Sequence, residues 1–576
     1  MYGRERLIVS AVAVALPGVI VAQVAAALAC AAAGHRAEAP AIGIAVFALV
    51  ITALQGWLGW LLRGGAFVVL KRCFTAVFPA AIAWVGIALV REQSLSGVYQ
   101  ASVAISGIVL SVVSLVSAFV MPFLAAKLSG DLDGAFSRRR GLSIVWAIIA
   151  LLALGQGARL SIFMADIDQK WASAFPPSEH VVHHQCLAAY VRAGEMSRQG
   201  EANLWDPNHY PSAAGLPEPP ESSVEELGPY LGDRYLYPPP FILVPRGLLA
   251  ITNSFMDIRI LVFGINALGL FAVPFLLACW IGGREGLGAG LLLPAIWLNV
   301  GTIVTLQFGQ VHLLVVVTAV MGMILIEKNW PSLGGLLLAI AIVSKIFPGM
   351  LVLYLLMSRR WKAVIWTCAG VAILVLLTLG VAGWESFEFF FDYHLPRMAS
   401  GEAVIATDPS PLAIVFSGSI PAIPYKLREL GITVPEDIGW LISCVYAGVV
   451  IVLTLIAALR GGDRRNRAAQ WLVVILLASL GGPSGPTAYI FIPALWLATL
   501  HPPRGRGLRV WGFGLFMLIA IFALGPLPPV NPGKILMALS FAGPVLAIGL
   551  SVRAIVFQTK AMSIEPAPEG DSLQET

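Results

Sequence analysis

Long apolar stretches recur along almost the whole chain, with short polar segments between them. They lie at residues 7–33, 41–62, 73–90, 100–126, 141–164, 238–252, 260–281, 286–305, 310–326, 332–357, 363–383, 437–459, 468–482, 487–499, 510–526 and 535–557. About 20 apolar residues in a helix match the thickness of a bilayer, and a helix satisfies its own backbone groups in lipid. The pattern therefore predicts an all-α polytopic membrane protein with roughly 14 to 16 transmembrane helices.

The composition excludes a water-soluble protein. Apolar residues make up 58% of the chain and charged residues only 12%, whereas soluble domains carry about 25% charged residues. The mean hydropathy is +0.83. The net charge of +5 reflects basic residues at helix ends, which control topology, so membrane lipids and no nucleic acid are the expected surroundings.

The basic residues in short loops predict the orientation of the chain. Clusters such as Arg359 to Lys362 and Arg460 to Arg467 are assigned to the cytoplasm. Counting crossings from them places both termini in the cytoplasm and two long loops, 165–236 and 384–436, outside the plasma (inner) membrane. Between 238 and 357, prolines interrupt the helices, and a re-entrant segment is left open there.

Three regions follow from this reading. Residues 1–140 are expected to form a four-helix N-terminal membrane extension, residues 141–560 the main membrane domain with both outer loops, and residues 561–576 a disordered cytoplasmic tail. Within the first outer loop, Gln185 to Gln199 has helical character, and Gly200 follows as its stop signal.

Titratable residues near the ends of membrane helices are the first candidates for chemistry. Asp166 and Asp168 follow the fifth apolar stretch directly, and His184 lies further along the same loop. Each can act as a general base, although an ordinary hydrated helix end explains the two carboxylates equally well. Zinc binding by His180, His183 and His184 lacks a recognised ligand spacing. We expect no cofactor and no metal site, with a divalent ion left open.

Polar residues inside apolar stretches are costly and often functional. Lys345 lies in the middle of a long apolar run, where its ammonium group needs a partner such as a substrate phosphate or snorkels to an interface. In the second outer loop, Asp392-Tyr-His394-Leu-Pro-Arg397 offers an imidazole and a guanidinium for a phosphate. Lys345, Arg397 and His394 are therefore the candidate phosphate-binding residues. No phosphate-binding glycine loop of a nucleotide site is present.

Three groups of short motifs resemble bacterial polytopic glycosyltransferases of the C-type superfold, specifically glycosyltransferase family 87. The first group is Tyr190-Val-Arg-Ala-Gly194, Leu204-Trp-Asp-Pro207 and Tyr235-Leu-Tyr-Pro-Pro-Pro-Phe241. The second is Gly309-Gln310, Gly334-Gly335, Lys345-Ile-Phe-Pro348 and Arg359-Arg-Trp361, and the third is Asp408-Pro-Ser-Pro-Leu412. Together they cover about residues 165–420, and their order carries the resemblance.

The resemblance implies an inverting hexosyltransferase, most simply a mannosyltransferase. Such enzymes take a sugar from a polyprenyl-phosphate donor and pass it to a lipid or glycan acceptor, while a loop aspartate activates the acceptor hydroxyl. At the position of that aspartate, four residues before Tyr190, this chain has Cys186. Asp166, Asp168 or His184 is therefore expected to act instead. The substrate-pocket candidates are Tyr190, Tyr237, Gln310, Asp392 and Ser410.

Two other functions stay open from the sequence. A transporter or flippase of a lipid-linked glycan also has many membrane helices, but transporters usually show internal repeats, and the halves of this chain share no pattern of helix lengths. A catalytically inactive member of the family that serves as an assembly partner is the other alternative, because of Cys186.

Overall fold

The computed structural model describes only part of the chain. The described residues are 140–174, 182–210, 222–228, 230, 234–282, 289–290, 293–399, 417–435, 438–482 and 541–556, together with residues 24, 27, 28, 31, 286, 414, 493, 494, 496, 497 and 500. The predicted N-terminal extension, except for a few isolated positions, and the predicted tail lie outside these residues.

The described part of the protein is built from helices. The longer ones are α6 (Arg140–Ala165), α8 (Cys186–Arg198), α10 (Leu243–Ile251), α11 (Phe255–Ile281), α13 (Leu293–Leu298), α14 (Val300–Gln307), α15 (His312–Glu327), α16 (Pro331–Ser344), α17 (Met350–Met357), α18 (Trp361–Ala382), α24 (Ile438–Arg460), α25 (Arg464–Leu480) and α29 (Ala542–Val556). Short elements are η2 (Lys170–Ala172), η3 (Pro207–His209), η4 (Pro239–Ile242), η5 (Phe347–Gly349), α19 (Glu385–Glu388), η6 (Phe389–His394), α20 (Leu395–Ala399), η7 (Ile420–Ala422) and α23 (Ile423–Glu429).

Several described helices have the length and composition of membrane spans. Among them, α11, α18 and α24 are each long and apolar enough to cross a bilayer, and the bent pair of α14 and α15 has the composition of a broken span or a re-entrant loop. The protein is thus an all-α polytopic membrane protein, as the apolar pattern predicts. The full number of spans remains a prediction, because much of the chain lies outside the described residues.

The apolar stretch 332–357 is not one helix, as the proline at position 348 predicts. Helix α16 ends at Ser344, Lys345 is extended with φ −150° and ψ 132°, and η5 and α17 follow. Pro348 explains the break, because a proline ring clashes with the carbonyl four residues earlier, here that of Ser344, and offers no N–H to it. Lys345 therefore stands at an interruption within an apolar segment.

A second interruption separates α14 from α15. The two helices meet at 104°, and Gly309 between them has φ +61°, a value that favours glycine. Gln310 lies in this bend. Non-helical backbone at membrane depth is tolerated where protein or a polar cavity surrounds it, so both interruptions are places where polar side chains can be housed.

Glycines allow the central helices to approach closely. Helix α15 packs on α16, and α16 packs on α18. A Cβ atom on Gly334 would lie 2.6 Å from the carbonyl oxygen of Gly322, so only glycine fits this crossing. This packing holds α16, and Lys345 at its end, in a fixed position.

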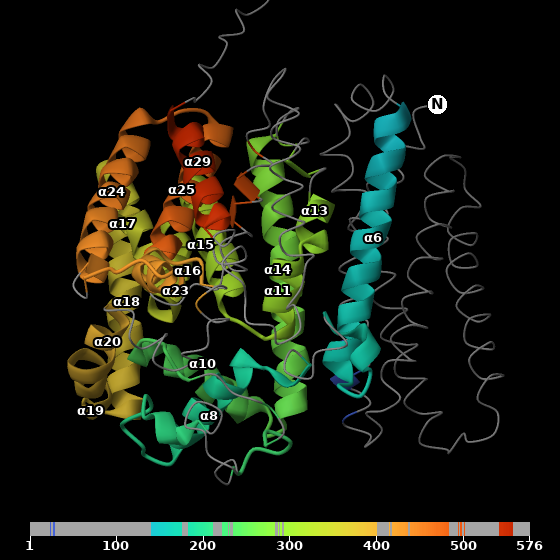
Figure 1. The fold of residues 1–576 in the computed structure, drawn as a ribbon, viewed down its shortest axis with the longest axis vertical. Coiled ribbons are helices and arrows are strands. Elements are labelled where there is room, and N and C mark those ends of the chain that lie inside the picture. Colours follow the sequence, from blue (N-terminus) through green and yellow to red (C-terminus); the bar gives the residue numbers. More distant parts are fainter. Residues whose placement is uncertain are drawn as a thin grey trace, which may run out of the picture.

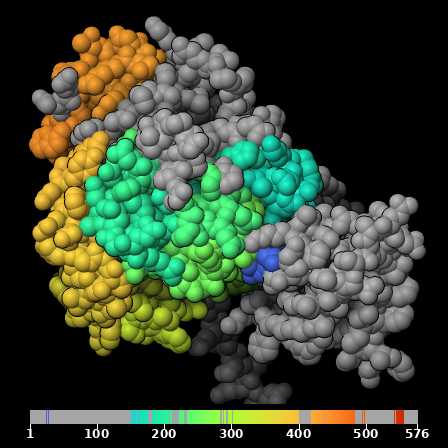
Figure 2. All heavy atoms as spheres, turned by 90° about the horizontal axis from the view of Figure 1, so that it is seen from below, coloured from blue at the N-terminus to red at the C-terminus, as the bar shows by residue number. Residues whose placement is uncertain are grey.

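Both predicted outer loops contribute to the same end of the molecule. Figure 1 shows α8, α10, α19 and α20 together at one end, with α24, α25 and α29 grouped towards the other. Seen from that end, the green residues of the first loop lie between α6 and the yellow region that contains α18 and α20 (Figure 2). The short helix predicted over Gln185 to Gln199 is confirmed as α8, and Gly200 after it has φ +87°.

Candidate functional site

Two tyrosines and a glutamine form the centre of the candidate site. The hydroxyls of Tyr190 and Tyr237 lie 2.5 Å apart, and they donate to Oε1 of Gln310 at 2.7 and 2.6 Å. All three side chains are buried. Three of the predicted pocket residues, far apart in the sequence, are thus brought together.

Each member of this cluster comes from a different local structure. Tyr190 lies on α8, Tyr237 directly precedes the proline-rich start of η4, and Gln310 lies in the bend between α14 and α15. The amide of Leu187 donates to the carbonyl of Phe308 at 3.2 Å, which ties α8 to the bend. A Cβ on Gly309 would lie 2.8 Å from that of Leu187, so glycine is required for this approach as well as for the turn.

Lys345 borders the cluster from the broken end of α16. Its Nζ lies 5.3 Å from the centroid of the Tyr237 ring, within the range of a cation–π contact. Lys345 also interacts electrostatically with Cys186 on α8 and with His312 on α15. An ammonium group held in this way can neutralise a phosphate that enters from the membrane.

His184 and Cys186 lie beside one another at the start of α8. The sulfur of Cys186 is 3.7 Å from Nε2 of His184, and the His184 ring meets Phe308 edge-on at 4.5 Å between centroids. Cys186 is almost fully buried, whereas His184 is half-buried. Of the three predicted bases, His184 is the one that connects to Lys345 through the contacts of the described residues, by way of Cys186.

An aromatic layer covers the cluster on the side of the second outer loop. Trp205 donates from Nε1 to the carbonyl of Tyr237 at 3.2 Å, and its ring contacts Tyr235, Phe390 and His394. Trp205 and Tyr235 were not among the predicted site residues. The signal for them was present, since both stand in the motifs Leu204-Trp-Asp-Pro207 and Tyr235-Leu-Tyr.

His394 is enclosed by this layer. Its ring stacks on Trp205 with centroids 5.8 Å apart. Burial lowers the pKa of His394 to about 4, although a hydrogen bond with the backbone of Leu236 acts in the opposite direction. A neutral, enclosed imidazole suits contact between the two outer loops better than binding of a phosphate.

Arg397 has a second arginine beside it. Its guanidinium lies 4.8 Å from the centroid of the Tyr393 ring and donates to the Tyr393 hydroxyl. Burial, followed by repulsion from Arg397, lowers the pKa of Arg234. Loop 165–236 thus brings a second cation, Arg234, close to Arg397 of loop 384–436. No motif in the sequence pointed to Arg234.

The two aspartates have local partners. Asp166 accepts hydrogen bonds from the amide of Asp168 at 3.0 Å and from Nε2 of Gln169 at 3.2 Å, and it interacts electrostatically with the buried Arg259. Asp168 is exposed. This arrangement closes the turn after α6, and the contacts described here do not link either aspartate to Lys345.

Of the remaining predicted residues, Asp392 is the one that the structure describes. Asp392 is exposed on η6. Ser410 lies outside the described residues, as does His180. Within the described part of the chain, no group of three or more His, Cys, Asp or Glu side chains is arranged to hold a metal.

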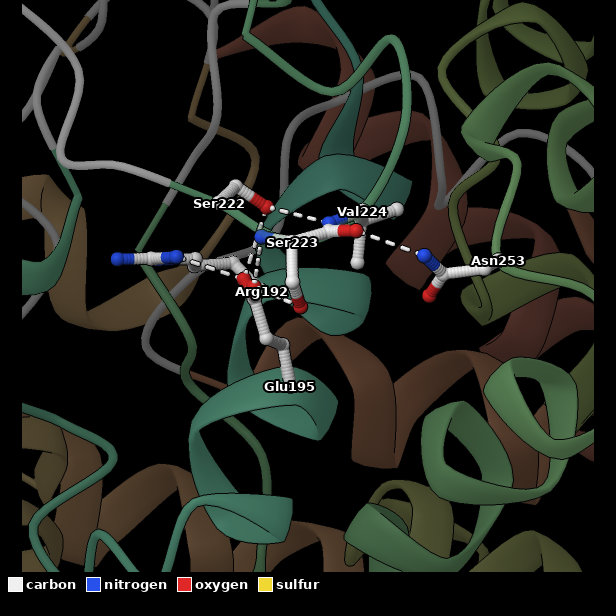
Figure 3. A network of polar contacts seen from close by, with 6 residues as sticks. All are labelled: Arg192, Glu195, Ser222, Ser223, Val224 and Asn253. Atoms are coloured by element: carbon white, nitrogen blue, oxygen red, sulfur yellow. Dashed lines mark hydrogen bonds and ion pairs between the residues drawn. The ribbon is translucent and has the colours of Figure 1, made fainter.

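A buried carboxylate anchors the first outer loop to α8 (Figure 3). Glu195 accepts from Arg192 at 2.6 Å, from the hydroxyls of Ser222 and Ser223 at 2.9 and 2.8 Å, and from the Ser223 amide at 2.5 Å. Burial alone would raise the pKa of Glu195, but the hydrogen bonds from Ser223, Arg192 and Ser222 together hold it below its usual value. This network keeps α8, and hence Tyr190, in place.

Part of the chain is similar to known proteins. The sequence profile of glycosyltransferase family 87 matches residues 235–483. A polyprenol-phosphate-mannose-dependent alpha-(1-2)-phosphatidylinositol mannoside mannosyltransferase of Mycolicibacterium smegmatis is 25% identical over 197 residues, which is 34% of this chain and 41% of that protein. The corresponding pentamannoside mannosyltransferase of the same organism is 26% identical over 295 residues, 49% of this chain and 67% of that protein.

The match therefore spans less than half of the first relative and about two thirds of the second. No solved structure matches the chain. The matched region holds Tyr237, Gln310, Lys345, His394 and Arg397, whereas Tyr190 and His184 precede it. The resemblance of this chain to glycosyltransferase family 87 is thus confirmed over residues 235–483.

Proposed function

We propose that the protein is a membrane glycosyltransferase that moves a hexose, mannose, from a polyprenyl-phosphate donor to a hydroxyl of a lipid or glycan acceptor on the outer face of the membrane. The family match and the donor named for both relatives support this class of reaction. The acceptor surface is the end of the molecule at which α8 and α20 lie together (Figure 1).

The observation that carries the proposal is the position of Lys345. Its ammonium group stands at a helix break, between an apolar segment and the cluster of Tyr190, Tyr237 and Gln310. A polyprenyl chain stays in the bilayer, so its phosphate and sugar arrive at such a boundary. Lys345 stabilises the negative charge that grows on the phosphate as the sugar leaves. Arg397, with Arg234, supplies a second cationic point on the outer side.

The reaction needs a base for the acceptor hydroxyl. In the proposed step, the hydroxyl oxygen attacks the anomeric carbon from the side opposite the phosphate, and the bond from that carbon to the phosphate oxygen breaks with inversion. The hydroxyl proton passes to a ring nitrogen of His184, which lies beside Cys186, a residue that interacts electrostatically with Lys345. General bases of this kind contribute about 10²- to 10⁴-fold.

The test is transfer of radiolabelled mannose from polyprenyl-phosphate mannose in membranes that carry wild type, Asp166→Asn, Asp168→Asn or His184→Ala. We expect transfer by wild type, its loss in His184→Ala, and its retention in Asp168→Asn. Loss in either aspartate variant with retention in His184→Ala would move the base to that aspartate. No transfer of label by wild type, with this or another polyprenyl-phosphate sugar, would reject the enzyme.

A transporter or flippase of a lipid-linked glycan is the second candidate. The 104° bend between α14 and α15 favours it, because transporters place binding sites at broken helices. Movement of the labelled lipid across proteoliposomes without transfer of its sugar would support this reading. We propose that no cofactor is needed, and activity that survives a metal chelator would agree.

A further inference from the structure

We propose that Cys186 is a positioning residue: its sulfur, as a thiolate, orients His184 and makes it a stronger base. The inference rests on the proposed function for the role of His184, but the pairing itself is a property of the free protein. It assigns a task to a cysteine whose surroundings are unlike those of Cys368, which is exposed on the apolar helix α18.

Three features around Cys186 favour a thiolate. Cys186 is the first residue of α8, a helix of 13 residues whose N-cap, Gln185, makes no side-chain capping bond. The partial positive charge of a helix N-terminus stabilises an anion there. The imidazole of His184 lies 3.7 Å from the sulfur, and Lys345 interacts with it electrostatically. Burial opposes ionisation of the thiol, but adjacent Lys, His and a helix N-terminus outweigh it in other proteins.

The geometry assigns the thiolate a defined role in proton transfer. A sulfur that accepts the Nε2 proton of His184 leaves the lone pair of the neutral ring on Nδ1, in the way that an acid orients the histidine of a catalytic triad. When His184 takes the proton of the acceptor hydroxyl, an imidazolium forms beside the thiolate and is stabilised by it. The proton then leaves His184 to water or to the departing phosphate, and the pair is restored.

Cys186 is also correctly placed relative to the substrate cluster. Tyr190 follows it by four residues on α8, so the two side chains lie on the same face of that helix. Lys345, which interacts with Cys186, also lies over the ring of Tyr237. The thiol, the imidazole and the ammonium group thus converge next to the two phenols.

Other charged groups pack around α8 and have to be distinguished in any pH experiment. The elements that contact α8 are α10, α11 and η4. They carry Arg246, Asp257 and Arg259, with Tyr237 directly before η4 and His183 shortly before α8, and Lys345 interacts with Cys186 from the end of α16. Arg246 binds Ser197 at the far end of α8, and Arg259 binds the carbonyl of Met164. Lys345 is the group that a pH experiment has to control for, because it interacts electrostatically with Cys186.

The first test needs no activity. The ultraviolet absorbance of thiolate is titrated in the detergent-solubilised full chain, and the curve of Cys186→Ser is subtracted from that of wild type; Cys368→Ser serves as the matched control. We expect a midpoint for Cys186 below about 8.5, the value of an ordinary thiol, and a higher midpoint in Lys345→Met. A midpoint at or above that value that Lys345→Met leaves unmoved would overturn the proposal.

The second test uses transfer of labelled mannose across a range of pH. In Cys186→Ser we expect kcat to fall by up to about 10-fold and KM for the donor to stay unchanged. The acidic limb of the pH–rate profile should move to lower pH, because removal of a neighbouring anion makes His184 less basic. Cys186→Asp should restore both kcat and the limb, and restoration should require His184. If wild type is active and Cys186→Ser has the same pH profile, the pairing of Cys186 with His184 is rejected, but the proposed enzyme activity stands. If wild type is inactive, the enzyme activity is rejected, and the thiolate titration alone tests the pairing.

Discussion

The ammonium group of Lys345 lies 5.3 Å from the centre of the Tyr237 ring, although 108 positions separate the two residues in the chain. The contact joins the broken end of α16 to the loop that enters η4. It places a cation over the ring of Tyr237, whose hydroxyl lies 2.5 Å from that of Tyr190, and so creates a polar site next to apolar helices.

Substitution of this lysine tests the site directly. Lys345→Met should reduce transfer about 10²-fold or more, because the developing charge on the phosphate loses its counterion. Lys345→Arg should retain part of the activity. Steady-state transfer of labelled mannose measures both. Lys362→Met, at an exposed position at the start of α18, is the matched control, and an equal loss there would mean that general charge and not position matters.

Removal of the phenol hydroxyls should weaken the cluster in a coupled way. Tyr190→Phe and Tyr237→Phe each remove a hydroxyl that donates to Gln310, at a cost of about 1 kcal/mol of stability per bond. Because the two hydroxyls lie 2.5 Å apart and share one acceptor, their contributions are coupled, and the double variant should lose less than the sum of the two single losses. Thermal unfolding in detergent measures this, and simple additivity would show that the hydroxyls act independently.

The two aspartates should differ in their effect on stability. Asp166→Asn should lower the thermal midpoint, because Asp166 closes the turn after α6 and faces Arg259. Asp168→Asn should change the free energy of unfolding by less than about 0.5 kcal/mol, as is usual for a substitution at an exposed position. A comparable loss in both variants would contradict the assignment of the structural role to Asp166 alone.

The Glu195 network should make the outer loop sensitive to acid. Hydrogen bonds hold the pKa of Glu195 below its ordinary value, so the stability that it contributes is complete above about pH 4.3, the value for an unfolded chain. This contribution is lost as the pH falls from there through the lower value of the folded state. The resistance of the loop to protease should therefore fall in wild type as the pH is lowered. In Glu195→Gln the resistance should already be lower at neutral pH and should change less with pH.

Close packing of α15 on α16 should depend on the absence of a side chain at Gly334. Gly334→Ala would place a Cβ 2.6 Å from a backbone oxygen, and we expect a loss of about 1–3 kcal/mol from the forced separation of the helices. Gly380→Ala on α18, where a Cβ would meet nothing within 4 Å, is the control and should be neutral or stabilising. Thermal unfolding followed by fluorescence compares the two.

The sequence by itself determined that the protein is helical, membrane-embedded and similar to family 87. Apolar runs of bilayer length are compatible with few structures other than membrane helices. Motifs such as Tyr235-Leu-Tyr-Pro and Lys345-Ile-Phe-Pro are local patterns that can be recognised without knowledge of the fold. The end of the helix before Pro348 also follows from local chemistry, because a proline ring clashes with the carbonyl four residues earlier.

Tertiary structure alone decided which candidates meet. His184, Asp166 and Asp168 look equivalent as polar residues of one loop, and only the folded chain places His184 beside Cys186 and Asp166 against Arg259. The same holds for Arg234 and Arg397, which come from different loops. The physical reason is that contacts between distant segments depend on helix crossings and backbone bends, which are set by packing over the whole bundle and not by any local pattern.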